Sequence, residues 1–290
     1  MATKLHLRLK SLEDDDPWIV EQKNFAIRKD FLQPDSYISP ADAAFQINEL
    51  TPMKREAQGE EDVEHPESYM WEIWGFFIEI SKQIPHDHPS QDKLVSLIKE
   101  LTLLPSVEVE IWGPSDCVLQ KKLRVWADLP LMGAAWTEAW DEPSDYDDSY
   151  EAFKQGINWH AFSARLLQSG LTRWFMYAVR IFRLASEEEP YRKKDTWEYR
   201  ICAAAQWIEH SRQAIFQKLD SEFSTKELNQ MAEGPLYKGK EGMSHERWDF
   251  WEAEFRAFGG ERAGEVSEET ASIYRKAAQQ MTETGLMSDE

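Results

Sequence analysis

Apolar residues recur at the spacing of helices over most of the chain, and no segment shows a convincing strand-like alternation. The pattern is steady from Pro66 onward, where Pro85 and Pro89 separate a first long helix from a second that runs to about Leu104. Further helices are expected over residues 126–140, 157–185 and 196–219 and after Ser244. The spacing therefore predicts an all-α fold.

The first 65 residues differ from the rest, because short helical patterns there are interrupted by acidic, proline-containing spacers. The last of these, "EAQGEEDVEHP" at residues 56–66, is typical of an exposed linker. We therefore expect an N-terminal arm over residues 1–65, a single helical domain over 66–283 and a disordered tail over 284–290.

The chain is strongly acidic, with 53 Asp and Glu residues against 33 Lys and Arg residues and a formal net charge of -20. Such a charge repels phosphate backbones and anionic membrane surfaces, so nucleic acid is not an expected partner. A small anion such as a diphosphate can still bind, because a few lysines or a bound cation reverse the sign of the charge locally.

Two cysteines and the lack of a leader-like segment near Met1 favour a reduced, cytoplasmic setting. No stretch approaches the roughly 20 uninterrupted apolar residues of a membrane-spanning helix. Aromatic residues make up 12% of the chain, which is ample for a core and can also line a cavity. The sequence does not indicate an oligomeric state.

The first long helix carries a candidate metal site. Glu72, Phe76, Glu79 and Gln83 fall on one stripe, because seven residues make about two helical turns. One interpretation is the solvated stripe of an amphipathic helix. The other is that Glu72 and Glu79 hold Mg²⁺ in a cavity, since this ion binds one or two carboxylates together with substrate phosphate oxygens.

Asn158, Phe162, Arg165 and Ser169 form a similar stripe on a later helix. This face can serve hydrogen bonding between helices. Alternatively, Asn158 is a metal ligand, while Arg165 and Phe162 contact the substrate, with Arg165 as a phosphate clamp.

The corner "HDHPSQD" carries His86, Asp87, His88 and Asp92, but its spacing fits no familiar zinc motif. A corner that caps the following helix explains these residues. Asp87 and Asp92 are nevertheless candidate Mg²⁺ ligands if the corner faces a cavity.

Two acidic segments resemble the metal-binding motifs of class I terpene cyclases. "DDSYE" at residues 147–151 matches the Asp-Asp-x-x-Asp/Glu pattern, within a spacer where such a pattern arises easily by chance. "DSEFSTKE" at residues 220–227 approaches the second motif, with its last glutamate one position early. No Gly-rich phosphate loop follows a strand and no G-x-S-x-G elbow occurs, which argues against Rossmann and hydrolase folds.

The loop "GPLYKGKEGMSHERW" precedes an aromatic helix with Ser244 as the expected N-cap. A turn between two helices explains its glycines. It does not explain why Lys238 and Lys240 flank Gly239, an arrangement that can bring two ammonium groups and main-chain N–H donors to one anion.

Several segments together resemble a largely fungal, all-helical family of unknown function, and they cover roughly residues 66–258. These segments are "IPHDHPSQDKLV", "WADLP", "NWHAFSARL", "AAAQWIEH" and "PLYKGKEGMSHERWDFW". The loop also resembles that of the non-standard humulene synthases of fungal tropolone-sesquiterpenoid pathways, with Leu236 before Lys240. The second resemblance implies a terpene-cyclase-like helical bundle that binds farnesyl diphosphate with Mg²⁺ and an essential lysine.

By this resemblance Lys240 is the catalytic, diphosphate-binding lysine and Leu236 is a pocket residue that shapes the product, with a lesser part for Lys238. Mg²⁺ and lysine would stabilise the departing diphosphate, and an aromatic cavity would shield carbocations from water. The expected function is a Mg²⁺-dependent sesquiterpene cyclase of fungal secondary metabolism. The alternative is a non-catalytic helical scaffold or regulatory protein whose Trp-rich faces are core.

Overall fold

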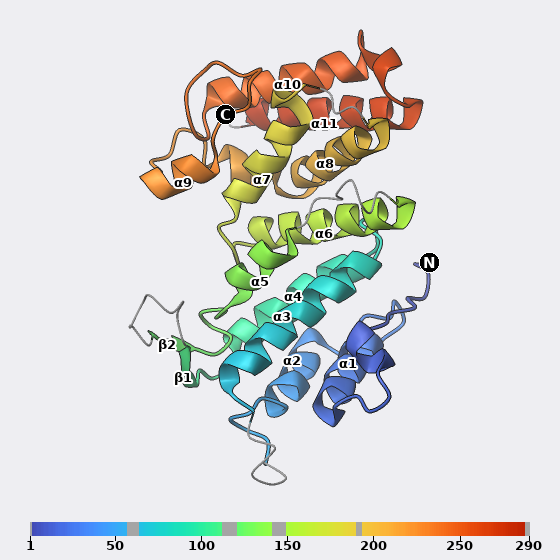
Figure 1. Ribbon diagram of the computed structural model, residues 1–290, viewed down its shortest axis with the longest axis vertical. Coiled ribbons are helices and arrows are strands. Elements are labelled where there is room, and N and C mark those ends of the chain that lie inside the picture. The colour runs from blue at the N-terminus through green and yellow to red at the C-terminus, as the bar shows by residue number, and fades with distance from the viewer. Residues whose placement is uncertain (1, 57–63, 112–120, 141–148, 190–192, 288–290) are drawn as a thin grey trace. The chain divides into compact units, whose positions relative to one another are not determined.

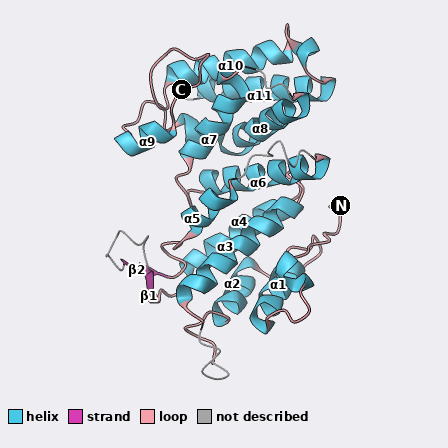
Figure 2. Ribbon diagram, viewed as in Figure 1, coloured by secondary structure: helices cyan, strands magenta, loops and turns pink. Residues whose placement is uncertain are grey.

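The computed structural model describes residues 2–56, 64–111, 121–140, 149–189 and 193–287. They form two compact units, Met1–Glu142 and Pro143–Glu290. Helices make up nearly all the regular structure of the described residues, which confirms the all-α prediction (Figures 1 and 2). None of the described helices is long and apolar enough to cross a membrane.

The first unit contains five α-helices among its described residues. They are α1 (Ile19–Phe31), α2 (Pro40–Glu49), α3 (Pro66–Gln83), α4 (Ser90–Leu103) and α5 (Met132–Ala139). Pro40 and Pro66 stand in the first turns of α2 and α3, where a missing N–H costs nothing. Ser39 Oγ caps α2 by accepting from Asp42 N at 3.1 Å. The corner before α4 lies where the two prolines predict it.

Two tryptophans form the centre of the first unit. Trp74 and Trp126 are fully buried and pack edge to face, with ring centroids 6.1 Å apart. Trp74 Nε1 donates to Pro130 O at 2.7 Å, and Trp126 Nε1 donates to Asn48 Oδ1 at 2.9 Å. Both rings therefore bury their apolar area without leaving an N–H unbonded.

A short antiparallel hairpin joins α4 to α5, and the expectation of no strand was wrong here. β1 (Glu108–Ile111) pairs with β2 (Lys121–Arg124), with Val109 opposite Leu123. In β1 Val109 and Ile111 are buried and the two glutamates are exposed. Four residues give too short an alternation to be recognised in the sequence.

The expected N-terminal arm lies within the first unit. Its first residues run extended, with Leu5, Leu7 and Leu9 buried. The side-chain amide of Gln83 in α3 makes two hydrogen bonds to this segment. It accepts from Arg8 N at 2.9 Å and donates to Arg8 O at 2.7 Å. Helices α1 and α2 follow, so residues before 66 contribute to the core of this unit. The expected acidic linker lies mostly outside the described residues.

The second unit contains six α-helices in its described part. They are α6 (Tyr150–Gln168), α7 (Phe175–Phe182), α8 (Lys194–Phe216), α9 (Thr225–Gln230), α10 (His245–Gly259) and α11 (Glu268–Met287). Helix α8 packs against both α6 and α11, and α10 packs against α11. Trp207 Nε1 donates to His160 Nδ1 at 3.0 Å and so joins α8 to α6 inside the core.

The helix expected over residues 157–185 is divided in the structure. Helix α6 ends before Gly170, whose φ of 77° lies in the left-handed region that glycine adopts without strain. Helix α7 follows and continues into a π-helical turn, Arg183–Glu187. This turn carries Glu187 into the interior of the unit, where its side chain is fully buried.

Candidate functional site

The loop between α9 and α10, residues 231–243, is built on a buried ion pair. Arg247 Nε donates to Glu187 Oε1 at 2.7 Å, and Arg247 Nη2 donates to Glu187 Oε2 at 3.0 Å. Both side chains are 0% exposed. A bidentate arrangement of this kind is the strong form of an arginine–carboxylate contact.

Arg247 uses all five of its N–H groups. Beyond Glu187, its guanidinium donates to Met231 O at 2.7 Å, Gly242 O at 2.8 Å and Ala232 O at 3.3 Å. The charge is therefore compensated by a carboxylate and by main-chain oxygens from both ends of the loop.

Glu187 is equally well satisfied. Its carboxylate also accepts from Trp251 Nε1 at 2.6 Å and from Gly234 N at 2.7 Å, and its main-chain oxygen accepts from Leu236 N at 2.9 Å. Gly234 has no room for a side chain, because a Cβ there would lie 2.6 Å from Glu187 Cβ. The first half of the loop is thus laid directly on Glu187.

Lys240 stands at the tip of this loop. Its Nζ lies 2.6 Å from Asp220 Oδ1, and His245 Nδ1 lies 2.6 Å from Asp220 Oδ2. The contacts to His245 and Lys240 lower the pKa of Asp220 to about 2. The Lys240 side chain is 63% exposed, so its ammonium group is accessible to a ligand in spite of this pairing.

The tip borders a hollow of about 340 Å³. Its lining residues are Asp220, Ser221, Glu222, Phe223, Leu228, Lys240, Glu241 and Met243. The structure therefore brings the lysine loop together with the start of the segment "DSEFSTKE". Glu227 at the end of that segment forms a capping box with Ser224 at the start of α9 and does not line the hollow.

Both lysines of the loop are exposed, and Lys240 pairs with Asp220. Lys238 is exposed, and Leu236 is 41% exposed. Gly239 between the lysines has a packing reason, since a Cβ there would collide with Tyr237 Oη and the Glu246 carboxylate. Lys240 N donates to Glu246 Oε2 at 3.1 Å, which helps to hold this tight passage.

The α6 residues predicted to contact substrate or metal lie in the same unit as the loop. Asn158 and Phe162 are buried at 2% and 0% exposure. Arg165 is half-buried, and its Nη1 donates to Ala161 O at 3.2 Å in its own helix.

Glu72, Glu79, Asp87 and Asp92, the remaining predicted metal ligands, lie in the first unit. Burial, followed by hydrogen bonding and negative charge from Glu21, raises the pKa of Glu72 to about 9. Glu79 Oε1 accepts from a main-chain N–H of the N-terminal segment at 2.7 Å. Asp87 and Asp92 are exposed beside the corner.

The grouping of acidic, histidine and cysteine side chains bears on metal binding. Across the described residues, no three His, Cys, Asp or Glu side chains gather closely enough to hold a metal ion. Asp147 and Asp148 of the "DDSYE" pattern fall outside the described residues, whereas Ser149 caps α6.

Sequence reasoning missed Glu187 and Arg247, and only one of them left a signal. Arg247 precedes Trp251 by four positions and so shares its apolar helix face. An arginine on such a face indicates a buried acidic partner, because a buried charge needs compensation. Nothing near Glu187 in sequence identifies it as that partner.

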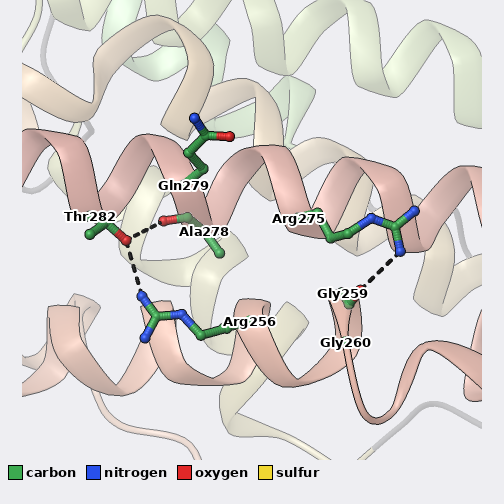
Figure 3. A pocket seen from close by; sticks show the side chains of 7 residues that line it. All are labelled: Arg256, Gly259, Gly260, Arg275, Ala278, Gln279 and Thr282. Carbon is green, nitrogen blue, oxygen red and sulfur yellow. Dashed lines mark hydrogen bonds between the residues drawn. The ribbon is translucent and has the colours of Figure 1, made fainter.

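A second hollow, of about 310 Å³, lies where α10 and α11 pack side by side (Figure 3). Arg256 Nη2 donates to Thr282 Oγ1 at 3.1 Å, and Arg275 Nη1 donates to Gly259 O at 3.0 Å. These two arginines join one helix to the other. The Lys240 hollow is the preferred candidate site, because it contains the lysine that the loop resemblance singles out.

Residues 74–255 match the model of a family described as "Protein of unknown function (DUF3632)", and the chain belongs to this family. The matched segment includes Glu187, Arg247 and the whole Lys240 loop. No curated protein and no solved structure matches the chain.

Proposed function

We propose that the protein is a Mg²⁺-dependent class I terpene cyclase of secondary metabolism that acts in the cytoplasm. Its substrate in this proposal is farnesyl diphosphate, and its product is a humulene-type sesquiterpene. The observation that carries the proposal is Lys240, an exposed ammonium group at the rim of a hollow, on a loop with a rigid base. The resemblance of this loop to that of the humulene synthases supplies the substrate.

The proposed reaction begins with heterolysis of the bond between C1 and the diphosphate oxygen. The electron pair leaves with the diphosphate, and Lys240 stabilises the negative charge that develops there. The allylic cation then closes onto the distal double bond, and loss of a proton gives the neutral hydrocarbon. Leu236, four positions before Lys240 and 41% exposed, contacts the prenyl chain in this proposal and influences which product forms.

Lys240 must leave Asp220 at least in part when a diphosphate binds. The pair is exposed, with side-chain exposures of 63% and 41%, and exposed pairs contribute little net free energy. A multiply charged anion therefore competes readily for this ammonium group.

Magnesium would neutralise the diphosphate and assist its departure. The described residues include no ready cluster of three acidic ligands, so no protein ligand is assigned to the ion. Asn158, Arg165 and Phe162 remain proposed contacts from α6. Metal binding by Glu72, Glu79, Asp87 and Asp92 stays a prediction from their sequence pattern alone.

The test is incubation of the purified protein with farnesyl diphosphate, with and without Mg²⁺, followed by analysis of volatile products. We expect Lys240→Ala to lose about 2–4 kcal/mol of transition-state stabilisation, a rate loss of tens to several hundredfold. Lys238→Ala is the matched control, since it removes an exposed lysine two positions away and should keep most activity. Both variants should melt like the wild type, because such surface changes usually cost within about 0.5 kcal/mol.

Two results would contradict the proposal. One is a Lys240→Ala variant that cyclises as fast as the wild type. The other is a wild type that neither makes hydrocarbon nor gains thermal stability from Mg²⁺ with a non-hydrolysable prenyl diphosphate. The second result would favour the non-catalytic scaffold.

A further inference from the structure

We propose that Glu187 and Arg247 are positioning residues for Lys240 and Leu236. The buried pair holds the loop of residues 231–243 in one conformation and thereby sets where both side chains stand. The catalytic consequence rests on the proposed function, whereas the effect on the loop can be tested without it.

The two ends of the loop are tied to one group. Arg247 Nη1 donates to Met231 O at the start of the loop and to Gly242 O near its end, at 2.7 and 2.8 Å. A single guanidinium group therefore closes the loop, and its own position is fixed by Glu187.

The first half of the loop rests on the π-helical turn. Glu187 is the last residue of that turn, and it offers the loop both its carboxylate and its main-chain oxygen. The first accepts from Gly234 N and the second from Leu236 N. π-Helical turns occur often at functional sites, and here the turn presents Glu187 to the loop.

The tip is connected to the same pair through Tyr237. The central carbon of the Arg247 guanidinium lies 5.5 Å from the centroid of the Tyr237 ring. Tyr237 Oη donates to Lys240 O at 3.3 Å. Lys240 N is held by Glu246, the neighbour of Arg247 in the first turn of α10. The main-chain oxygen of Lys240 is therefore held by Tyr237, which contacts Arg247, and its main-chain N–H is held by Glu246, the residue before Arg247.

Placement of this kind matters for the proposed chemistry. A charged donor stabilises a leaving group most when it is already oriented before the charge develops. Displacement of about 1 Å at a reacting centre can reduce a rate by about a hundredfold. Glu187 and Arg247 are fully buried, so they act through the loop and are not catalytic residues.

The first test uses Gly234→Ala, which removes no polar group but adds a methyl where Glu187 leaves no room. We expect the main-chain amides at positions 234 and 236 of this variant to exchange hydrogen for deuterium about tenfold faster than in the wild type, or more. The amides of α8 should keep their wild-type protection from exchange. Gly264→Ala is the matched control, because nothing lies within 4 Å of a Cβ there. Equal exchange in the two variants would overturn the inference.

Trp251→Phe is the second variant and covers the case in which Gly234→Ala does not fold. It removes the 2.6 Å hydrogen bond to Glu187 Oε1 but keeps an aromatic ring at that place. We expect faster exchange at Gly234 and Leu236 again, with retained helical structure. Unchanged exchange at both amides would contradict the positioning role.

The effect of the loop on catalysis is measured from the rate of product formation and from the ratio of products. If the protein cyclises farnesyl diphosphate, Gly234→Ala should lower kcat more than it raises KM and should change the ratio of products. Gly264→Ala should do neither. A wild type without cyclase activity would remove the proposed function but leave the exchange experiment valid. An active Gly234→Ala variant with wild-type kcat and product ratio would overturn the catalytic part of this inference.

Discussion

Among the described residues, each of the two units buries one arginine completely, and the hydrogen bonding of the two arginines differs greatly. Arg247 in the second unit and Arg28 in the first are both 0% exposed. Arg247 donates to Glu187 and to three main-chain oxygens, so each of its five N–H groups has an acceptor. Arg28 sits on α1 with far fewer hydrogen-bonding partners.

Arg28 is stabilised mainly by aromatic rings. Its Nη1 donates to Asn24 O and Asn24 Oδ1, each at 3.1 Å, but Nε and Nη2 have no partner among the described protein atoms. The guanidinium lies 4.7 Å from the centre of the Phe77 ring. Burial lowers the pKa of Arg28 to about 10, against the opposing charges of Tyr69 and Glu72.

The comparison shows that burial of a charge does not by itself build a structural anchor. Arg247 organises a loop because its partners belong to the segments that must be held. The hydrogen bonds of Arg28 to Asn24 reach one turn back in its own helix, so they tie no distant segment to it. The difference predicts a large loss of stability for Arg247→Met and a small change for Arg28→Met.

The largest effect is expected for Arg247→Met. This change leaves the Glu187 carboxylate buried without its cation and releases three main-chain oxygens, so it should lower the free energy of unfolding by about 3–5 kcal/mol. Urea denaturation followed by tryptophan fluorescence measures this. A loss below about 1 kcal/mol would mean that the pair is not an anchor.

Glu72 provides the next test, because its carboxyl lies near Arg28 and yet favours the protonated form, with a pKa of about 9. A pKa raised above its ordinary value of 4.5 contributes stability at low pH that is lost as the pH rises toward 9. Glu72→Gln mimics the protonated form and should remove this loss. Melting temperatures from pH 5 to pH 9 should diverge in favour of the variant, and parallel curves would contradict the assignment.

A smaller change is expected for Arg28→Met, the counterpart of the first substitution. Methionine fills a similar space without the cost of burying a charge that is only partly bonded, so stability should change by less than about 1.5 kcal/mol. Denaturation under the same conditions as for Arg247→Met gives the comparison directly. Equal losses of unfolding free energy in the two variants would show that the number of hydrogen bonds made by the buried arginine does not determine its contribution to stability.

The smallest effect is expected for Asp220→Asn. The Lys240–Asp220 distance of 2.6 Å is close to the 2.7 Å of the buried pair, but exposed pairs contribute only about 0–1 kcal/mol. Asparagine also tolerates the left-handed φ of 56° at this position. A thermal melt should therefore barely change. A drop as large as that of Arg247→Met would mean that distance matters more than burial.

The sequence alone determined the local features of this protein. The prolines near the starts of α2 and α3, the corner at Pro85 and Pro89, and Ser244 as the cap of α10 are all visible in the sequence. Each depends on interactions within about one helical turn, which short patterns report well. The composition of the loop pointed to Lys238 and Lys240 together, and only the resemblance to the humulene synthases singled out Lys240.

Only the tertiary structure decided what the loop rests on. Glu187 and Arg247 are 60 positions apart, and Lys240 and Asp220 are 20 positions apart. No short-range pattern reports such pairs, and Glu187 meets Arg247 only because the π-helical turn packs against α10. Burial then turns one pair into an anchor and leaves the other exposed. That distinction depends on the surrounding side chains and not on the residue types.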